Sequence, residues 1–347
     1  MLGGSIRPGA PAVHGSGDPR SYRWQDWELR DLVAAKNAAG RTVSLVVPAR
    51  NEAAGVGSVV RRVRTALMET VALLDEIVVI DSDSEDDTFA VAADTGAAVY
   101  RSRDIRPDLG SHPGKGEALW KSLFVTRGDL LVFMDADLID WDTHFVPGLL
   151  GPLLTEPEVT LVKGRYERPY LDGGTESAQQ GGRVTELVAL PLITLLFPQL
   201  RGLAQPLAGE WAIRRSQFES LSVPTGYGVE IAALIDTLHH AGPGAIAQVE
   251  LGRRTHRHQS LYDLGAMATQ VMAAALSRAT GELPPGMSAP EVIRPDVIRP
   301  EVIQPDVIRP EVIQPQVIRP EMVLPETVPL KQVSVRLTER PPARLVA

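Results

Sequence analysis

The sequence predicts an α/β fold in which a mainly parallel sheet is covered by helices on both faces. Apolar strand-like runs alternate with helical runs through the first half of the chain, as in consecutive βαβ units. These strand runs end in polar residues, which is expected where ligands bind beyond the carboxyl ends of parallel strands. The C-terminus differs from the rest, because proline recurs every five residues from Pro290 to Pro325.

The predicted elements follow one another in a regular order. Residues 24–39 predict a short amphipathic helix closed by Gly40. Four strands are predicted at VSLVVPARNE, EIVVIDSDS, AAVYRS and GDLLVFMDADL, with helices at about 55–73, around 90–94 and around 117–125. Farther along, VTLVKGRY and AIAQVELG predict strands, residues 182–200 predict an apolar helix interrupted by prolines, and residues 261–278 predict a helix.

We therefore expect one α/β domain over residues 22–278. Residues 1–21 are rich in Gly, Pro and Ser and predict a disordered arm. Residues 279–332 predict an extended Pro-rich linker, because proline removes a backbone donor and restricts the residue before it. Residues 333–347 are a separate C-terminal segment. A chain that ends after Arg278 is expected to keep most of its activity, because such repeats cannot build a core.

Composition excludes several classes of protein. The 35 basic and 43 acidic residues give a formal charge of −8, which argues against nucleic acid as a partner. The chain has no cysteine, so disulfides and thiolate metal sites are excluded and a reducing cytoplasm is the expected location. The most apolar stretch, Leu187 to Phe197, is much shorter than the ~20 residues of a membrane span, and the N-terminus lacks the apolar region of a secretory signal.

Asp135-Ala136-Asp137 is the motif that most directly suggests chemistry. Residues i and i+2 at the end of a strand face the same side, so both carboxylates can converge on one point. Carboxylate oxygens suit Mg²⁺ or Mn²⁺, which typically also bind substrate phosphate oxygens. The alternative is that these aspartates are ordinary turn residues after an apolar strand.

The order of three strand-end motifs favours the metal site. VVPARNE comes first, IDSDSEDDT follows about 30 residues later, and FMDADL follows about 50 residues beyond that. This order resembles the nucleotide-sugar half of GT-A glycosyltransferases, in which two loops hold the nucleoside and the DxD motif holds the diphosphate through a metal. PGKGE is not a P-loop, because Gly116 stands where Ser or Thr would meet Mg²⁺.

Longer motifs resemble the glucosyl-3-phosphoglycerate synthase family of actinobacteria. The resemblance covers about residues 24–278 and is carried by PGKGEALWKSL, LVKGRYERP, GGRVTELVALPL, QPLAGEWA, GYGVEIAALID and AIAQVELGRRTHRH. The final VSVRLTERPP also resembles the C-terminal end of this family. The resemblance implies a GT-A fold and a homodimer. It also implies retaining transfer of glucose from UDP-glucose to the 2-hydroxyl of 3-phosphoglycerate, with Mg²⁺, or Mn²⁺ or Co²⁺, as cofactor.

The resemblance also implies roles for individual residues on the donor side. The donor nucleotide sugar would be bound by residues from several loops: Pro48, Ala49, Asn51, Glu52, Ser82, Lys115, Asp135, Ala136 and Glu230. Arg50 stands where the family has an aliphatic residue. Glu230 would bond sugar hydroxyls, or would cap the following helix. The metal ligands would be Asp137 and His256, which together with Asp135 are the expected catalytic residues.

The acceptor side is implied in the same way. A glycine-flanked loop and two later residues would grip the phosphate and carboxylate of 3-phosphoglycerate: Gly182, Arg183, Val184, Thr185, Arg254 and His258. Guanidinium groups and backbone N–H groups are suited to these anions. His258 stands where the family commonly has Asn.

Three other functions remain open at this point. A mannosyl-3-phosphoglycerate synthase would use GDP-mannose and differ in only a few pocket contacts. An inverting transferase acting on a polyprenyl phosphate would usually carry a membrane anchor. A catalytically inactive nucleotide-sugar-binding scaffold is disfavoured because Asp135, Asp137 and His256 are all present.

Overall fold

An eight-stranded sheet forms the centre of the protein, with strand order β1-β11-β6-β9-β5-β2-β3-β4. The computed structural model describes residues 19–167, 170–172, 175–177, 182–254, 261–280, 291–294, 331–334 and 337–346. Neighbouring strands pair in parallel, except that β9 is antiparallel to both β5 and β6. The predicted α/β fold with a mainly parallel sheet is confirmed.

Six of the eight strands of the main sheet lie close to the predicted runs, whereas β1 and β9 were not predicted. The main sheet consists of β1 (Arg20–Arg23), β2 (Val43–Ala49), β3 (Glu76–Asp81), β4 (Ala98–Arg101), β5 (Leu130–Phe133), β6 (Leu161–Glu167), β9 (Trp211–Arg214) and β11 (Ile246–Arg253). Three short antiparallel pairs lie outside it: β7 (Tyr170–Asp172) with β8 (Thr175–Ser177), β10 (Val223–Pro224) with β14 (Glu339–Arg340), and β12 (Glu291–Arg294) with β13 (Lys331–Ser334).

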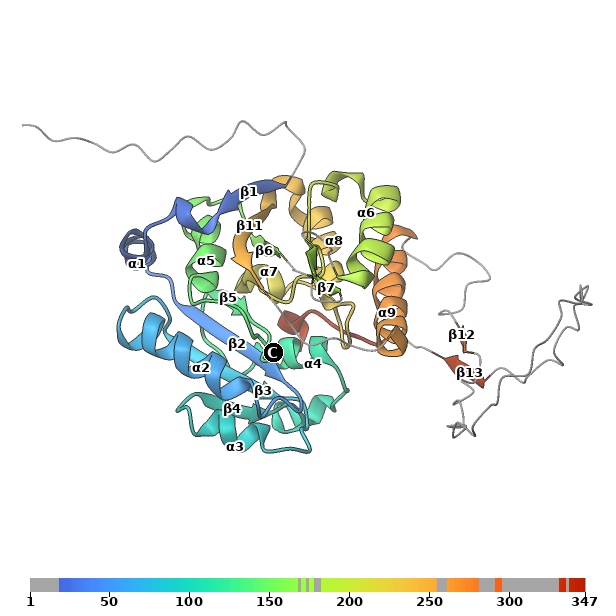
Figure 1. The fold of residues 1–347 in the computed structure, drawn as a ribbon, viewed down its shortest axis with the longest axis horizontal. Helices are drawn as coiled ribbons and strands as arrows, with labels where there is room; N and C mark the ends of the chain where they lie inside the picture. The colour runs from blue at the N-terminus through green and yellow to red at the C-terminus, as the bar shows by residue number, and fades with distance from the viewer. Residues whose placement is uncertain are drawn as a thin grey trace, which may run out of the picture.

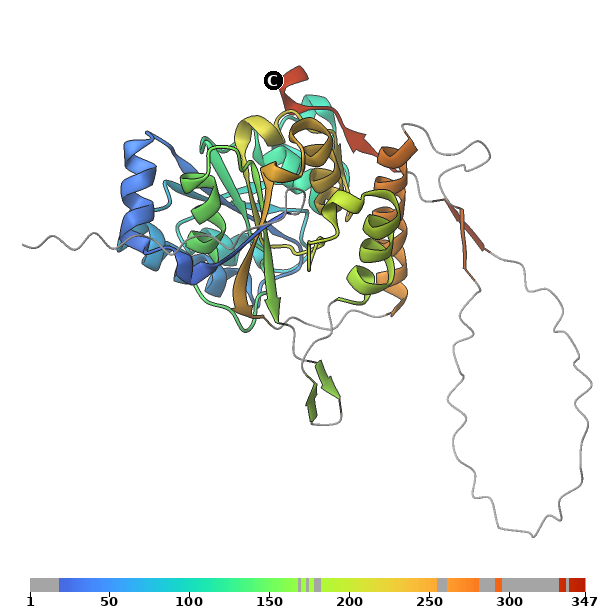
Figure 2. The same cartoon turned by 90° about the horizontal axis from the view of Figure 1, so that it is seen from above.

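Helices cover both faces of the sheet (Figures 1 and 2). One face is covered by α1 (Leu29–Ala38), α2 (Val56–Arg64), α3 (Thr88–Ala93) and α5 (Phe145–Thr155). The other is covered by α4 (Lys115–Ser122), α6 (Leu190–Leu196), α7 (Arg215–Phe218), α8 (Val229–Ala241) and α9 (Leu261–Thr280). Short helical turns complete the chain: η1 (Trp24–Asp26), η2 (Thr65–Glu69), η3 (Ser102–Asp104), η4 (Pro107–Leu109), η5 (Thr185–Ala189), η6 (Pro198–Leu200), η7 (Pro243–Ala245) and η8 (Ala343–Leu345).

The strand sequences alternate between two hydrophobic cores. In β2, Leu45 and Val47 belong to the core beneath α2 and α5, whereas Val46 belongs to the core beneath α4 and α8. All three side chains are fully buried, as expected for a period of two in a strand covered on both faces. The sheet is therefore a rigid platform whose loops can carry chemistry.

Two predictions needed correction. The helix predicted over residues 24–39 begins only at Leu29, because Trp24 and Trp27 pack against α5. The glycine at 148 leaves room for the Cβ of Trp24, and the glycine at 151 leaves room for the Trp27 ring. The strand β9 was not predicted, since its four residues follow a polar loop and carry no distinctive alternation. Its insertion between β5 and β6 is decided by tertiary pairing.

The predicted terminal segments are only partly described. Residues 1–18 of the expected N-terminal arm and most of the repeat linker lie outside the described residues. The disordered arm was predicted to extend to residue 21, but Arg20 and Ser21 belong to β1, because they pair with β11. Among the helices that the structure describes, none is both long and apolar enough to cross a membrane.

Candidate active site

Polar residues next to the ends of three strands meet at one edge of the sheet. Asp135 and Asp137 follow β5, and Arg254 follows β11. Because β9 runs in the opposite direction, the residue before it, Glu210, reaches this same edge. The register pairs Phe133 of β5 with Trp211 of β9, which fixes Glu210 beside the Asp135 loop. This is the edge where parallel sheets of this kind bind ligands.

Arg254 lies at the centre of these residues and is 4% exposed. Its guanidinium lies 2.6 Å from the Glu210 carboxylate, 3.0 Å from that of Asp135 and 3.7 Å from that of Asp137. It also donates to the hydroxyl of Tyr166, whose ring it covers. One cation therefore holds three carboxylates at the sheet edge.

Lys115 approaches Asp135 from the opposite side. Its ammonium lies 2.7 Å from Asp135 and 2.8 Å from Glu230 in the first turn of α8. Lys115 is the first residue of α4 and follows Gly114, whose φ of +130° favours glycine. A Cβ at Gly114 would also collide with the carbonyl oxygen of Thr225. The glycine-flanked loop seen in the sequence thus serves to bring the lysine to the sheet edge.

These residues form what we name the sheet-end cluster, and its charges are not balanced. Four carboxylates face two cations, a formal surplus of two negative charges: Asp135, Asp137, Glu210 and Glu230 against Lys115 and Arg254. Burial alone would raise the pKa of Asp135, but the charges of Lys115 and Arg254 outweigh it and hold this pKa well below its usual range. Burial and the charge of Asp135 raise the pKa of Asp137.

The cluster has the chemistry of a partial site for a divalent cation. Hard carboxylate oxygens and surplus negative charge suit Mg²⁺ or Mn²⁺. Within the described part of the chain, no three His, Cys, Asp or Glu side chains are arranged to hold a metal by themselves. The expected second ligand, His256, lies outside the described residues. The residues present therefore fit a metal that is shared with substrate oxygens.

The two predicted nucleotide loops are joined by hydrogen bonds. Asn51 adopts a positive φ of 55°, and its side-chain oxygen accepts from the backbone N–H of Glu85 at 2.8 Å. The Asn51 N–H donates to the hydroxyl of Ser84 at 2.9 Å, and the backbone N–H of Ser82 donates to the carbonyl of Ala49 at 2.8 Å. The first two predicted loops, with Pro48 and Glu52, thus form one rim. This rim lies beside the sheet-end cluster, because β2 pairs with β5, the strand that leads to Asp135.

Only part of the predicted acceptor site lies within the described residues. Gly182 to Thr185 lie where the chain enters η5, with Arg183 exposed and Val184 and Thr185 buried. Arg254, which is expected to contact the acceptor, is packed among the carboxylates of the sheet-end cluster. His258 lies outside the described residues.

Sequence reasoning missed three buried residues, of which one belongs to the sheet-end cluster and two lie next to it. Glu210 is fully buried and Tyr166 is 3% exposed. Lys163 is 1% exposed, donates to the carbonyl of Ala208 at 2.6 Å and faces the Trp211 ring. Burial lowers the pKa of Lys163 to about 7. A signal for Glu210 was present in QPLAGEWA, where an acidic residue precedes an aromatic one, but only the pairing of β9 reveals its partner.

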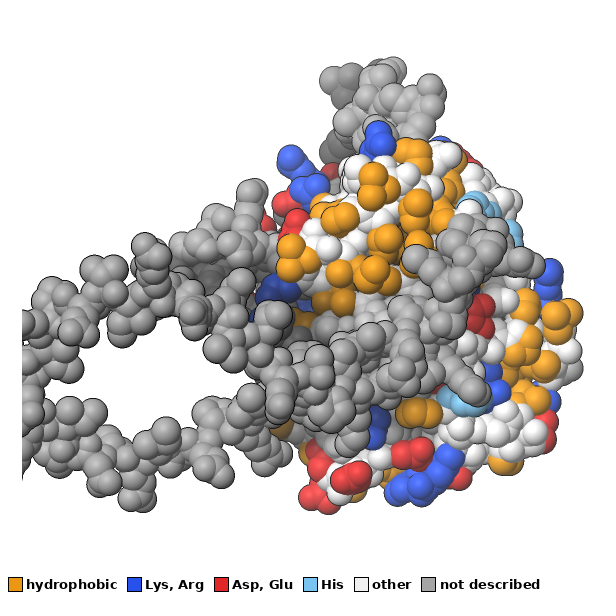
Figure 3. Space-filling view, turned by 90° about the vertical axis from the view of Figure 1, so that its right-hand side faces the viewer, with side chains coloured by type: hydrophobic (Ala, Val, Ile, Leu, Met, Phe, Trp, Pro, Cys, Tyr) orange, Lys and Arg blue, Asp and Glu red, His pale blue; other side chains and the backbone are white. Residues whose placement is uncertain are grey.

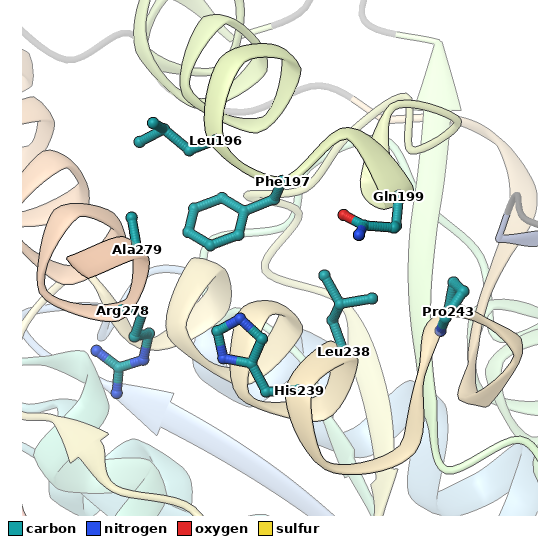
Figure 4. A pocket seen from close by; sticks show the side chains of 8 residues that line it. All are labelled: Leu196, Phe197, Gln199, Leu238, His239, Pro243, Arg278 and Ala279. Atoms are coloured by element: carbon teal, nitrogen blue, oxygen red, sulfur yellow. The ribbon is translucent and has the colours of Figure 1, made fainter. Parts of the chain in front are cut away.

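A separate pocket of about 320 Å³ lies between the end of α6, the end of α8 and the end of α9 (Figure 4). It is lined by both apolar and polar side chains: Leu196, Phe197, Gln199, Leu238, His239, Pro243, Arg278 and Ala279. None of the predicted site residues lines it. This pocket is therefore separate from the sheet-end cluster.

Comparison with known proteins decides the family. Residues 44–219 match the family described as "Glycosyl transferase family 2". Glucosyl-3-phosphoglycerate synthase of Mycolicibacterium smegmatis is 50% identical over 258 residues, which cover 74% of this chain and 84% of that relative. The chain belongs to the glucosyl-3-phosphoglycerate synthases.

Solved glucosyl-3-phosphoglycerate synthases share the fold described above. The Mycobacterium tuberculosis enzyme in complex with Mn²⁺, UDP-glucose and phosphoglyceric acid is 40% identical, with a TM-score of 0.74, over 92% of this chain and 96% of that one. The same enzyme in complex with Mn²⁺, UDP and glucosyl-3-phosphoglycerate has a TM-score of 0.72 at 39% identity, over 92% of this chain and 96% of that one. The predicted GT-A glucosyl-3-phosphoglycerate synthase fold is confirmed.

Proposed function

We propose that this protein transfers glucose from UDP-glucose to the 2-hydroxyl of 3-phosphoglycerate, with retention at the anomeric carbon and with a divalent metal as cofactor. The observation that carries the proposal is the sheet-end cluster, because Asp135 and Asp137 meet Lys115 and Arg254 at the ligand-binding edge of a sheet shared with the family. Relatives solved with Mn²⁺, UDP-glucose and phosphoglyceric acid support the choice of ligands.

The donor side follows from the charges of the sheet-end cluster. We assign the uridine to the rim that includes Pro48, Asn51 and Ser82, and the diphosphate to the space beside Lys115. The Lys115 ammonium is a compact cation that can contact diphosphate oxygens while remaining bonded to Asp135 and Glu230. Glu230, rather than only capping its helix, orients this lysine and can accept from a sugar hydroxyl.

The metal ligands on this chain would be Asp137 and His256. A divalent cation, when bound, offsets the negative charge that grows on the departing diphosphate. Asp135 remains ionised between Lys115 and Arg254 and holds both side chains in place. Mg²⁺, with Mn²⁺ or Co²⁺ as substitutes, fits such oxygen and nitrogen ligands.

Retention is best explained by attack on the same face from which UDP leaves. A double displacement would need a free carboxylate as nucleophile. In the described part of the site, Asp135, Glu210 and Glu230 are each ion-paired with Lys115 or Arg254, and Asp137 is assigned to the metal. The acceptor hydroxyl is then the nucleophile, and a phosphate oxygen of the leaving group takes its proton.

The acceptor side is assigned to the Gly182–Thr185 segment together with His258. The exposed Arg183 supplies a fork of donors, and the backbone N–H groups where this helical segment begins suit a phosphate. Arg254 acts mainly by holding the carboxylates of the sheet-end cluster, and its charge also faces an incoming carboxylate.

We also propose a homodimer in the cytoplasm. Large apolar side chains are exposed along η5, α6 and α9, with Leu187 and Leu195 exposed by 75% and 77%. Figure 3 shows hydrophobic side chains gathered on this side of the molecule, which suits a protein–protein contact. The absence of cysteine fits a reducing compartment.

One experiment tests the reaction. The purified protein is incubated with 3-phosphoglycerate and either UDP-glucose or GDP-mannose, with Mg²⁺ or with EDTA, and the product is identified by mass spectrometry and by the configuration of its glycosidic bond. We expect glucosyl-3-phosphoglycerate with the anomeric configuration of the donor, no product in EDTA, and no product from Asp137→Ala. A mannosylated product would reassign the donor, and undiminished turnover in EDTA would remove the metal from the reaction.

A further inference from the structure

The C-terminal segment (residues 337–346) packs against the donor side of the domain, far along the chain from the rest of the site. Figure 1 shows the C-terminus beside α4. The Trp120 side chain of α4 donates to the carbonyl of Pro341 at 2.9 Å, and Ala343 is buried in the core beneath α4 and α8. Between α9 and this segment the sequence includes the proline repeats from Pro290 to Pro325.

Arg340 is the anchor of this segment and is 7% exposed. Its guanidinium forms two hydrogen bonds to the Glu117 carboxylate, at 2.7 and 2.6 Å, and covers the Trp120 ring at 4.8 Å. Its remaining donors reach the carbonyls of Leu109 and Gly110 at 2.7 and 3.1 Å. Arg340 thus fastens both α4 and the loop that leads into α4.

A second set of contacts supports the start of α4. Strand β14, which contains Arg340, pairs with β10, and the N–H of Thr225 donates to the carbonyl of Thr338 at 2.9 Å. The carbonyls of Thr225 and Gly226 then accept from the N–H groups of Glu117 and Gly116 at 2.8 and 3.2 Å. The C-terminal segment therefore supports the first turn of α4 in two ways: directly through Arg340, and indirectly through the backbone of Thr225 and Gly226.

These contacts end at the donor-binding side chains. Lys115 is the first residue of α4, two residues before Glu117. Glu230 lies in the first turn of α8, a few residues after the segment that β14 holds. The Lys115–Glu230 ion pair of 2.8 Å thus connects the two elements that the C-terminal segment fastens.

We propose that Arg340 is a positioning residue of the donor site, through which the C-terminal segment holds Lys115 and Glu230 in their binding geometry. This inference rests on the proposed function. It also changes the expectation for a chain that ends after Arg278, because that truncation would remove Arg340 and leave the Glu117 carboxylate buried without its ion pair. Such a chain is now expected to bind the donor poorly.

The test uses full-length variants. Arg340→Met removes the guanidinium, and the double variant Glu117→Gln/Arg340→Met removes both charges so that no buried carboxylate is left unpaired. Arg344→Met is the matched control, because Arg344 is an exposed arginine of the same segment. For each protein we would measure kcat, the KM values of UDP-glucose and 3-phosphoglycerate, the Kd of UDP with Mn²⁺ by calorimetry, and the midpoint of thermal unfolding.

We expect Arg340→Met to raise the donor KM and the Kd of UDP about tenfold or more, while the acceptor KM stays within about twofold. The double variant should regain most of the unfolding midpoint but keep the raised donor KM, because the contacts to the carbonyls of Leu109 and Gly110 remain lost. Arg344→Met should behave as wild type.

Two results would overturn the inference: a donor KM that recovers together with stability in the double variant, or equal rises in both KM values. If Arg340→Met does not fold, the double variant decides. Failure of the proposed function can be distinguished from failure of this inference. If the proposed function were wrong, the wild type would form no product. The difference in the Kd of UDP between the variants would still test the role of Arg340.

Discussion

Glu210→Gln tests whether Arg254 is held in place by a buried ion pair. Glu210 and Arg254 are 2.6 Å apart, with side chains exposed by 0% and 4%. Glutamine keeps the shape of glutamate and one acceptor oxygen but removes the negative charge. Arg254 would then be balanced by Asp135 and Asp137 alone, at 3.0 and 3.7 Å.

The size of the effect follows from burial. Removing one partner of a buried ion pair costs about 3–5 kcal/mol, and a hydrogen bond to a charged group contributes about 1.5–3 kcal/mol. Burial raises the pKa of Glu210, so part of the charge–charge energy is already spent on desolvating this carboxylate. We therefore expect Glu210→Gln to lower the free energy of unfolding by about 1.5–3 kcal/mol, and Glu210→Ala by about 3–5 kcal/mol.

The assay is urea unfolding of the full chain, followed by circular dichroism, in the wild type and both variants. The matched control is Glu250→Gln, which breaks a pair with Arg165 at 3.0 Å whose side chains are 36% and 40% exposed. An exposed pair of this kind should change the free energy of unfolding by only about 0–1 kcal/mol.

A double-mutant cycle completes the test. Glu210→Gln and Arg254→Met should each be costly alone, but the double variant should cost less than their sum by about 1–3 kcal/mol, because neither charge is then left unpaired. Costs that add to within about 0.5 kcal/mol, or a loss for Glu210→Gln no larger than that of Glu250→Gln, would refute the role assigned to this pair.

Three further predictions follow from other parts of the site. Burial lowers the pKa of Lys163 from 10.5 to about 7. Between pH 7 and 10.5 the unfolded chain therefore holds a proton on this lysine that the folded chain has lost. The free energy of unfolding should then rise with pH in this range, by up to about 1.4 kcal/mol per pH unit. Lys163→Met should lack this slope in urea unfolding measured from pH 7 to 9.5. Gly116→Ala should reduce donor binding measured by calorimetry, because its Cβ would collide with the carbonyl oxygen of Pro224 and displace α4. Arg183→Ala should raise the acceptor KM about 10- to 150-fold and leave the Kd of UDP-glucose unchanged. The control is Arg201→Ala, which should change neither value, because in the described contacts the Arg201 side chain bonds only to the Thr194 carbonyl. Weaker donor binding by Arg183→Ala would instead assign its loop to the nucleotide.

Local pattern was sufficient to predict the framework of the sheet. The apolar runs that became β2, β3 and β5 are buried on both faces at nearly every position, so their sequences are almost continuously apolar. Polar residues such as Asp81 and Asp135 mark where these strands leave the core, and parallel pairing brings those ends to one edge. The position of the DxD motif therefore followed from sequence alone.

The partners of the buried charges were decided only by tertiary structure. Arg254 meets Glu210 and Asp135 across 44 and 119 residues, because β9 enters the sheet between β5 and β6 and β11 lies on the other side of β6. Arg340 meets Glu117 across 223 residues, because β14 pairs with β10. A periodic pattern records which side of one element is buried, but a salt bridge between distant elements depends on which strands become neighbours. Strand order is set by the packing of the whole core, so no local stretch of sequence specifies it.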